Sequence, residues 1–254
     1  LSDENRCKIQ SSFSTQISTI DTANNDVNIM PKKTDMADIK SALIFGLREY
    51  LRRTQMNQVV VGISGGIDSA VVAALAAEAI NPDHVRLVSM PTTFNSTQTQ
   101  HDAKLLAQQL GARFHAEPID DIRTQVSSAV ESISGMALTG ITKQNIQARI
   151  RGVLLMALAN NHQALLLTTG NKSELAMGYA TLYGDMCGGL NIIGDLFKTD
   201  VYELARYINA SKSVIPESII DREPSAELDL NQRDSDTLPE YHQLDQILDQ
   251  LMIQ

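Results

Sequence analysis

Cysteine is almost absent from this chain of 254 residues, which contains only Cys7 and Cys187. Two thiols so far apart argue against a disulfide framework and favour a reducing, cytoplasmic location. Long apolar runs are also missing, since none approaches the roughly 18 residues of a membrane span. The first residues do not form a signal-peptide pattern. We therefore expect no membrane partner.

Basic residues are outnumbered, with 21 Lys and Arg against 30 Asp and Glu and a formal net charge of −9. This balance argues against nucleic acid as a partner, but it allows a local basic pocket for a small anion. Hydrophobic residues make up 43% of the chain, enough for the core of one large α/β domain. The sequence starts at Leu1 instead of methionine, so we expect a fragment or a processed product.

The first 34 residues differ from the rest of the chain. Residues 1–34 are polar and lack a sustained period, which predicts a tail or linker. From Met36 onward, apolar residues recur every four positions, as on one face of an amphipathic helix. These residues are Ile39, Leu43, Leu47 and Leu51. We place a single domain at residues 35–254.

Short β-rich runs then alternate with helical patterns. Strands are predicted at 58–63, 84–90, 113–119 and 164–169, and helices at 68–81, near 98–110, near 143–161 and at 199–209, with a short helix at the C-terminal end. Such alternation implies right-handed crossovers and a parallel sheet. The fold class is therefore α/β, a parallel sheet flanked by helices.

A glycine-rich segment separates the first predicted strand from its helix, where residues 59–76 read VVVGISGGIDSAVVAALA. In such folds, ligands bind beyond the C-terminal ends of the strands, where the next helix points free N–H groups outward. Gly65 and Gly66 let the backbone approach a bulky anion, and Ser64 and Ser69 offer hydroxyl groups. The segment therefore predicts an anion-binding loop.

Asp68 is the unexpected member of this loop. A carboxylate repels bound phosphates unless a cation lies between them, so Asp68 suggests Mg²⁺. The alternative is a tight turn followed by a favourable acid in the first helical turn. No Gly-Lys-Ser/Thr follows the glycines, so the loop is not a Walker A motif. SGGIDS instead resembles the pyrophosphate loop of the N-type ATP pyrophosphatases, which cleave ATP between the α and β phosphates to adenylate a substrate.

Further segments indicate which family of this superfamily the chain resembles. They are NIQARIRG (145–152), LLLTTGNKSELAMGYATLYGDMCGGLN (165–191), GDLFKTDVYELARYIN (194–209), PSAEL (224–228) and QRDSDTLPEYHQLDQIL (232–248). Lys198 stands at a predicted helix start, where a cation opposes the helix dipole unless it reaches an anion. Together these segments resemble NAD⁺ synthetase, specifically the synthetase portion of the glutamine-dependent kind, over about residues 36–250.

This resemblance implies an adenine-nucleotide α-hydrolase-like (Rossmann-like) fold, a homodimer, and a deamido-NAD⁺ site at the dimer interface. Carried over by position, the residues that contact ATP are Gly62, Ser64, Gly65, Gly66, Asp68, Ser69, Thr169 and Lys198. Asp68 and Glu174 would bind Mg²⁺ and, with Lys198, form the catalytic group. Asn145, Arg149 and Glu174 would contact deamido-NAD⁺.

Simpler roles remain open for several of these residues. Arg149 and Arg151 could form a solvated helix face, and Thr169 could satisfy backbone groups at a strand end. Glu174 could be an exposed helix residue. Asn145 could cap a helix, as asparagine often does.

The resemblance implies ATP-dependent amidation of deamido-NAD⁺ to NAD⁺ through an NAD-adenylate, with AMP and pyrophosphate released and ammonia as the nitrogen donor. The glutamine-dependent relatives carry a glutaminase domain that residues 1–34 are too short to hold. We expect the chain to take free ammonia or to be a piece of a longer enzyme with a glutaminase domain or subunit. The basic segment near the family's C-terminus has no counterpart before Gln254.

Two other functions stay open. One is another N-type ATP pyrophosphatase that amidates or thiolates a different substrate. The other is a non-catalytic module that binds adenine nucleotides. Such a module would need neither a metal pair at Asp68 and Glu174 nor Lys198.

Overall fold

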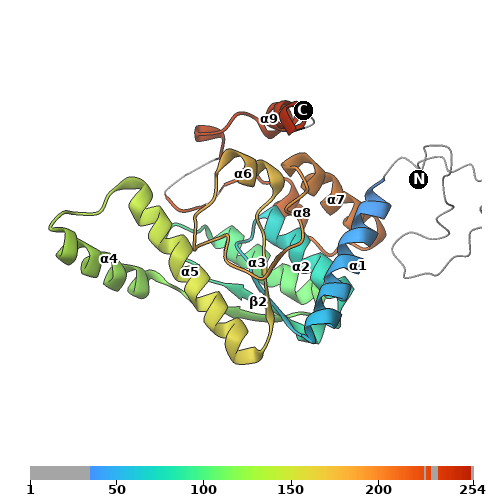
Figure 1. Cartoon of the computed structure of the whole chain (residues 1–254), viewed down its shortest axis with the longest axis horizontal. Helices are drawn as coiled ribbons and strands as arrows, with labels where there is room; N and C mark the ends of the chain where they lie inside the picture. Colours follow the sequence, from blue (N-terminus) through green and yellow to red (C-terminus); the bar gives the residue numbers. More distant parts are fainter. Residues whose placement is uncertain (1–34, 226, 230–233, 253–254) are drawn as a thin grey trace, which may run out of the picture.

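A computed structural model of the chain describes residues 35–225, 227–229 and 234–252 (Figure 1). The predicted tail, residues 1–34, lies outside the described residues. The α-helices are α1 (Met36–Thr54), α2 (Ile67–Ala79), α3 (Thr97–Leu110), α4 (Asp120–Ser134), α5 (Gly140–His162), α6 (Lys172–Met177), α7 (Lys198–Ser211), α8 (Glu217–Ile220) and α9 (Tyr241–Met252). Two short 3₁₀ turns, η1 (Pro82–His84) and η2 (Asp234–Asp236), complete the helical elements of these residues.

The strands form one parallel sheet in the order β3-β2-β1-β4-β5. They are β1 (Val59–Gly62), β2 (Val85–Ser89), β3 (Arg113–Ala116), β4 (Leu165–Thr168) and β5 (Leu190–Asn191). Val59 of β1 lies opposite Val85 of β2 on one side and Leu165 of β4 on the other. The predicted fold class, a parallel α/β sheet flanked by helices, is confirmed.

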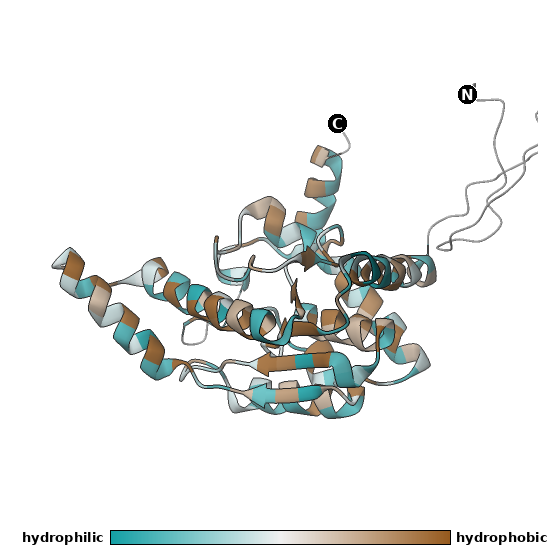
Figure 2. Ribbon diagram, turned by 60° about the horizontal axis from the view of Figure 1, so that its bottom comes forward, coloured by the Kyte–Doolittle hydropathy of each residue, from teal (hydrophilic) through white to brown (hydrophobic). Residues whose placement is uncertain are grey.

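The sheet separates two hydrophobic cores. Alternate residues of a strand point to opposite faces, and β1 follows this rule. Val59 and Val61 pack with apolar residues of α1, α2, α3 and α7, whereas Val60 packs with residues of α5. Figure 2 shows hydrophobic residues along the strands, interspersed with hydrophilic ones in the strands at the front, and helices around the sheet. The central strands are therefore buried on both faces, which explains their continuous apolar sequence.

Four elements depart from the sequence prediction. β5 is not among the predicted strands; it follows two glycines and is only two residues long. α6 and α8 span six and four residues, too few to show a helical period. The strand predicted at 113–119 ends at Ala116, because Ile119 already precedes α4.

α2 connects the fold to the site. It is apolar on nearly all sides, since it packs between β1, α1, α3 and α7. Its N-cap residue, Gly66, makes no side-chain capping bond, so the first N–H groups of α2 are free to meet a ligand. In the described part of the chain, no helix combines the length and apolar character that crossing a membrane requires.

The backbone at Gly65 generates the first prediction. Gly65 has φ +87°, and a Cβ built there would lie 2.4 Å from the backbone oxygen of Thr99. Gly65→Ala should therefore lower the free energy of unfolding by about 2 kcal/mol or more, because strain and a backbone clash add. The matched control is Gly46→Ala in α1, where a Cβ meets nothing within 4 Å. It should raise that free energy by about 0.5–1 kcal/mol. Urea unfolding of both variants measures the difference, and equal effects would contradict the packing described here.

Candidate functional site

A cavity of about 510 Å³ opens at the carboxyl ends of β1, β2 and β4. Eight of the predicted site residues line it: Gly62, Ser64, Gly66, Asp68, Ser69, Thr169, Glu174 and Lys198. Gly65 is not among the lining residues and packs against α3 instead. The location is the one where open parallel sheets bind their ligands.

The glycine-rich loop is held by its own serines. Ser64 Oγ accepts a hydrogen bond from Gly66 N at 3.1 Å, and Ser69 Oγ donates to Gly66 O at 3.0 Å. The two hydroxyl oxygens are 3.3 Å apart. These bonds run within the loop, so both serines shape it before any ligand arrives.

One buried cation and two carboxylates form the centre of the site. Lys198 is 3% exposed, and its Nζ lies 2.5 Å from Asp68 Oδ2 and 3.4 Å from Glu174 Oε1. The lysine at the start of α7 thus reaches anions, as its unfavourable position in the helix dipole suggested. Glu174 is only 20% exposed and Asp68 only 16%, so neither is an isolated surface acid.

Asn171 completes this cluster, and the sequence analysis did not single it out. Its Nδ2 donates to Asp68 Oδ1 at 2.9 Å, and its Oδ1 accepts from Glu174 N at 3.0 Å. Glu174 Oε2 accepts from Asn171 N at 3.2 Å, which makes a capping box at the start of α6. The pattern Asn-x-x-Glu was the available signal. The box fixes the carboxylate of Glu174 beside that of Asp68.

The last helix holds the start of α7. Asp245 of α9 is buried, and its Oδ2 accepts from Thr199 N and from Thr199 Oγ1, each at 2.9 Å. Its Oδ1 accepts from Ser173 Oγ at 2.5 Å, and Ser173 Oγ accepts from Lys198 N at 2.9 Å. Asp245 therefore caps α7 from another helix and sets the position of the lysine. No local sequence signal pointed to this contact.

The cluster shifts the pKa values of its members. Burial by itself would lower the pKa of Lys198, but Asp68 and Glu174 outweigh it and raise that pKa. Burial, with help from the charge of Asp68, raises the pKa of Glu174 to about 7 against the opposing effect of Lys198. The lysine therefore stays charged at neutral pH, while Glu174 titrates near neutrality.

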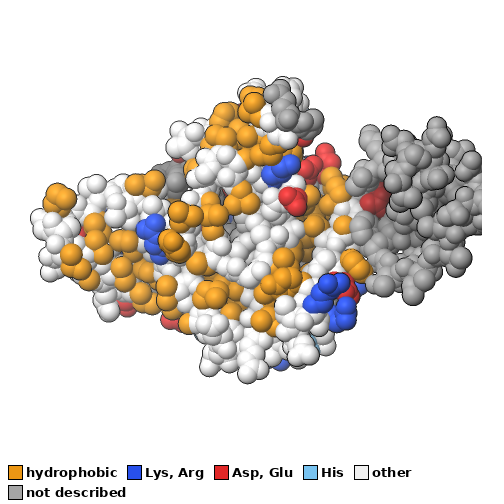
Figure 3. Space-filling view, viewed as in Figure 1, with side chains coloured by type: hydrophobic (Ala, Val, Ile, Leu, Met, Phe, Trp, Pro, Cys, Tyr) orange, Lys and Arg blue, Asp and Glu red, His pale blue; other side chains and the backbone are white. Residues whose placement is uncertain are grey.

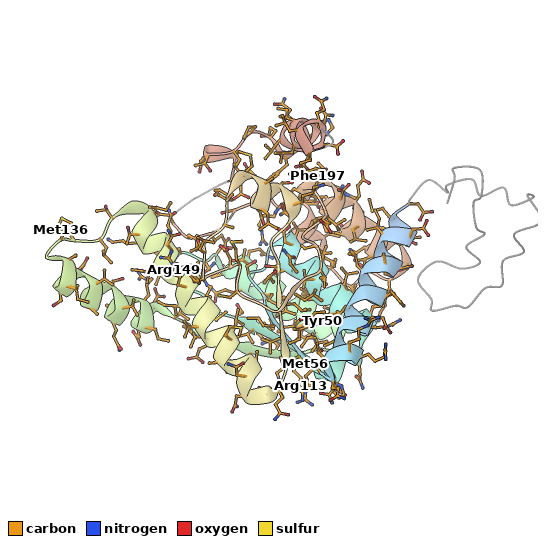
Figure 4. All side chains as sticks on the ribbon, viewed as in Figure 1. Tyr50, Met56, Arg113, Met136, Arg149 and Phe197 are labelled. Atoms are coloured by element: carbon orange, nitrogen blue, oxygen red, sulfur yellow. The ribbon has the colours of Figure 1, made fainter. Side chains whose placement is uncertain are left out.

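Two predicted substrate residues lie outside the cavity lining. Asn145 Oδ1 accepts from Thr181 Oγ1 at 2.9 Å. Arg149 is exposed, and its Nε donates to Leu182 O at 3.2 Å. Asn145 does not cap α5, because the helix begins at Gly140. In Figure 4, Arg149 lies on α5 well apart from Phe197, which precedes the lysine of α7.

Arg151 is the arginine of this segment that lines the cavity. Its Nε donates to Met90 O at 3.1 Å. Burial lowers the pKa of Arg151 to about 10, against the charges of Asp120 and Glu227. It is therefore not part of a solvated face, and it adds another cation to the lining of the cavity.

The donor set fits Mg²⁺ better than a transition metal. In the residues that the structure describes, no group of three or more His, Cys, Asp and Glu side chains could hold a metal ion. Asp68 and Glu174 supply two hard carboxylates on one cavity wall. Mg²⁺ is commonly held by one or two carboxylates together with substrate phosphates and water, so two suffice.

The fold and the loop define a class, Rossmann-like α/β proteins with an anion-binding loop after the first strand of the sheet. Comparison with known proteins identifies a family within this class. The model of the family described as NAD synthase matches residues 39–254. The chain belongs to the NAD synthase family.

Individual relatives agree with this assignment. A glutamine-dependent NAD(+) synthetase of Rhodobacter capsulatus is 44% identical over 234 residues, which cover 89% of this chain and 42% of the relative. A glutamine-dependent NAD⁺ synthetase structure from Acinetobacter baumannii, in complex with ADP, has a TM-score of 0.73 at 39% identity, over 87% of this chain and 40% of that one. An NMN synthetase structure from Francisella tularensis has a TM-score of 0.78 at 29% identity, over 85% and 87%. The chain thus spans less than half the length of the glutamine-dependent relatives.

The raised pKa of Glu174 generates a prediction about stability. A carboxyl whose pKa rises from 4.5 to about 7 on folding stabilises the fold below pH 4.5, and this contribution is lost as the pH rises through 7. Glu174→Gln keeps the capping box and removes the titration. Without metal, the variant should match the wild type near pH 4.5 and exceed its free energy of unfolding by about 1–3 kcal/mol at pH 8. Urea unfolding at both pH values measures this. A constant difference would show that Glu174 is not the group responsible.

Proposed function

We propose that the chain is a synthetase domain at residues 35–254 that converts deamido-NAD⁺ to NAD⁺. The reaction consumes ATP and ammonia and releases AMP and pyrophosphate. One observation carries the proposal: the glycine-rich loop and the cluster of Lys198, Asp68 and Glu174 face one cavity. The match to the NAD synthase family supports it.

The chemistry explains why these groups suit the reaction. A carboxylate is a poor electrophile, so the carboxylate of deamido-NAD⁺ must first be joined to AMP. Its oxygen attacks the α-phosphorus of ATP, and pyrophosphate is the leaving group. Negative charge then builds on pyrophosphate, where the free N–H groups of α2 and the ammonium of Lys198 can stabilise it. Ammonia finally displaces AMP. No side chain needs to act as a nucleophile, so the site mainly has to position two anionic substrates.

Mg²⁺ fits this proposal as the cation between Asp68 and the phosphates. Asp68 and Glu174 would hold it, and when bound it neutralises charge on the phosphate oxygens. Lys198 lies beside the same carboxylates. An ammonium group has three donors, so the lysine can reach a phosphate oxygen while it stays beside them.

A homodimer would place Arg149 in a binding site. α5 carries exposed apolar side chains on its outer face as well as buried ones on its inner face, and a contiguous exposed apolar patch is typical of an interaction surface. Val153 and Met156 are exposed and follow Arg149 at helical spacing. Figure 3 shows hydrophobic side chains gathered over α4 and α5. A second copy on this face would cover the patch and enclose Arg149.

Ammonia can reach the site free from solution or from a glutaminase part of a longer enzyme. The glutamine-dependent relatives are more than twice as long as the matched region, which supports a glutaminase part in the complete enzyme. Free ammonia is the alternative donor. The cytoplasmic location also stays a prediction from the cysteine content.

An end-point assay by mass spectrometry tests the function. With ATP, Mg²⁺, deamido-NAD⁺ and ammonium, the chain should form NAD⁺ and AMP, whereas glutamine in ammonia-free buffer should give none. Lys198→Met should lower the rate by about 10²–10³, because a preorganised donor to the leaving group is lost. Lys212→Met, at an exposed position, is the matched control and should retain the wild-type rate.

The outcomes of this assay are distinct. An arm with nicotinic acid mononucleotide is included because the Francisella relative is described as an NMN synthetase. Amidation of that compound in preference to deamido-NAD⁺ would change the proposed substrate. ATP binding without any amidation would indicate a nucleotide-binding module. Loss of activity in Lys212→Met would show that the Lys198 effect is not specific.

Light scattering tests the proposed dimer. Val153 is 67% exposed in the single chain, so Val153→Asp should leave the protomer fold intact and shift the mass from dimer to monomer. The control is Ile247→Asp on α9, where the side chain is 53% exposed and lies away from α5. A wild-type monomer, or dissociation by the control alone, would contradict the α5 interface.

A further inference from the structure

Arg222 is far from the glycine-rich loop in the sequence, but its side chain contacts that loop in the fold. Its Nη1 donates to Gly65 O at 3.1 Å, and its Nη2 pairs with Asp102 Oδ2. Arg222 also lines the main cavity, and its side chain is 24% exposed. The guanidinium thus joins α3 to the loop in a single bridge.

Asp102 is held so that it can orient this guanidinium. It is 1% exposed, and its Oδ1 accepts from Gln98 Nε2 and from Ser218 Oγ, each at 2.8 Å. Oδ2 is then left for Arg222. A buried carboxylate with several donors fixes the plane of its arginine partner, and the fork of the guanidinium can serve two acceptors at once.

A second contact joins the segment around Arg222 to the start of α3. Glu227 Oε2 accepts from Thr99 Oγ1 at 3.0 Å and from Asn95 Nδ2 at 2.9 Å. The backbone oxygen of Thr99 is also the atom that a Cβ at Gly65 would strike at 2.4 Å. The loop is therefore enclosed between the first turn of α3 and the segment that contains Arg222.

The bond to Gly65 O has a consequence for phosphate binding. A peptide unit is planar, so fixing its carbonyl also fixes the N–H of Gly66, which points the opposite way and donates to Ser64 Oγ. Gly66 lines the cavity and directly precedes α2, so this orientation sets where the first N–H groups of α2 point. Oriented N–H groups at such a place form an anion-binding concavity.

We propose that Arg222, oriented by Asp102, is a positioning residue that sets the glycine-rich loop for the pyrophosphate part of the nucleotide. It acts through the Gly65–Gly66 peptide and does not recognise the adenosine part. The inference rests on the proposed function in taking ATP as the nucleotide. A purely structural role would weaken all ligands of the cavity together, whereas this role weakens only those that carry the pyrophosphate group.

Calorimetric titration of the full chain with ATP–Mg²⁺, inorganic pyrophosphate and adenosine tests the proposal. Arg222→Gln should raise the dissociation constants of ATP and pyrophosphate about ten-fold or more, the usual effect of losing a charge-assisted hydrogen bond. The dissociation constant of adenosine should change less than about two-fold, because adenosine carries no pyrophosphate group and loses no hydrogen bond. Arg113→Gln, on the exposed surface of β3, is the matched control and should change none of the three.

Arg222→Lys keeps a cation beside Asp102 but lacks the planar fork, so it should give intermediate constants. If Arg222→Gln does not fold, the lysine variant alone decides. It should then bind ATP several-fold more weakly and adenosine with an unchanged dissociation constant. Equal weakening of ATP binding and adenosine binding, or unchanged ATP binding, overturns the proposal. Failure of the proposed function is seen separately, as wild-type chain that binds nucleotide but forms no NAD⁺.

Discussion

Burial of one ammonium group organises this site. Lys198 is removed from water, and a buried charge is tolerated only where opposite charges and hydrogen bonds compensate it. Asp68 after β1 and Glu174 after β4 provide that compensation. The two strands are neighbours in a parallel sheet, so their carboxyl ends bring both acids to one edge. The sheet order is thus the structural reason why three residues distant in the chain can meet.

The sequence predicted the parts that repeat or that form a compact motif. The apolar runs of β1, β2 and β4 and the period of α1 are strong local signals, and the fold class followed from them. β5 was missed because two residues between glycines carry no alternation. The loop was found because its glycines and serines lie close together in the sequence, and Asp68 of the loop and Lys198 of α7 lie in the same cavity.

The supporting contacts could not be predicted in the same way. Asn171 and Asp68 are 103 residues apart, and Arg222 and Asp102 are 120 apart. Each pair depends on the tertiary arrangement, and each residue alone resembles an ordinary polar residue of a loop or helix. Asn145 and Arg149 were correctly placed on a helix near 143–161, but a helical pattern does not tell which face meets the cavity. Their part in substrate binding remains a prediction.

The cap that Asp245 supplies to α7 links the position of Lys198 to the packing of α9, the last described helix. Asp245 is buried and accepts hydrogen bonds from Ser173, which contacts the lysine backbone, and from Thr199, which follows the lysine in the sequence. A substitution that loosens α9 would therefore shift the lysine without replacing any residue that lines the cavity.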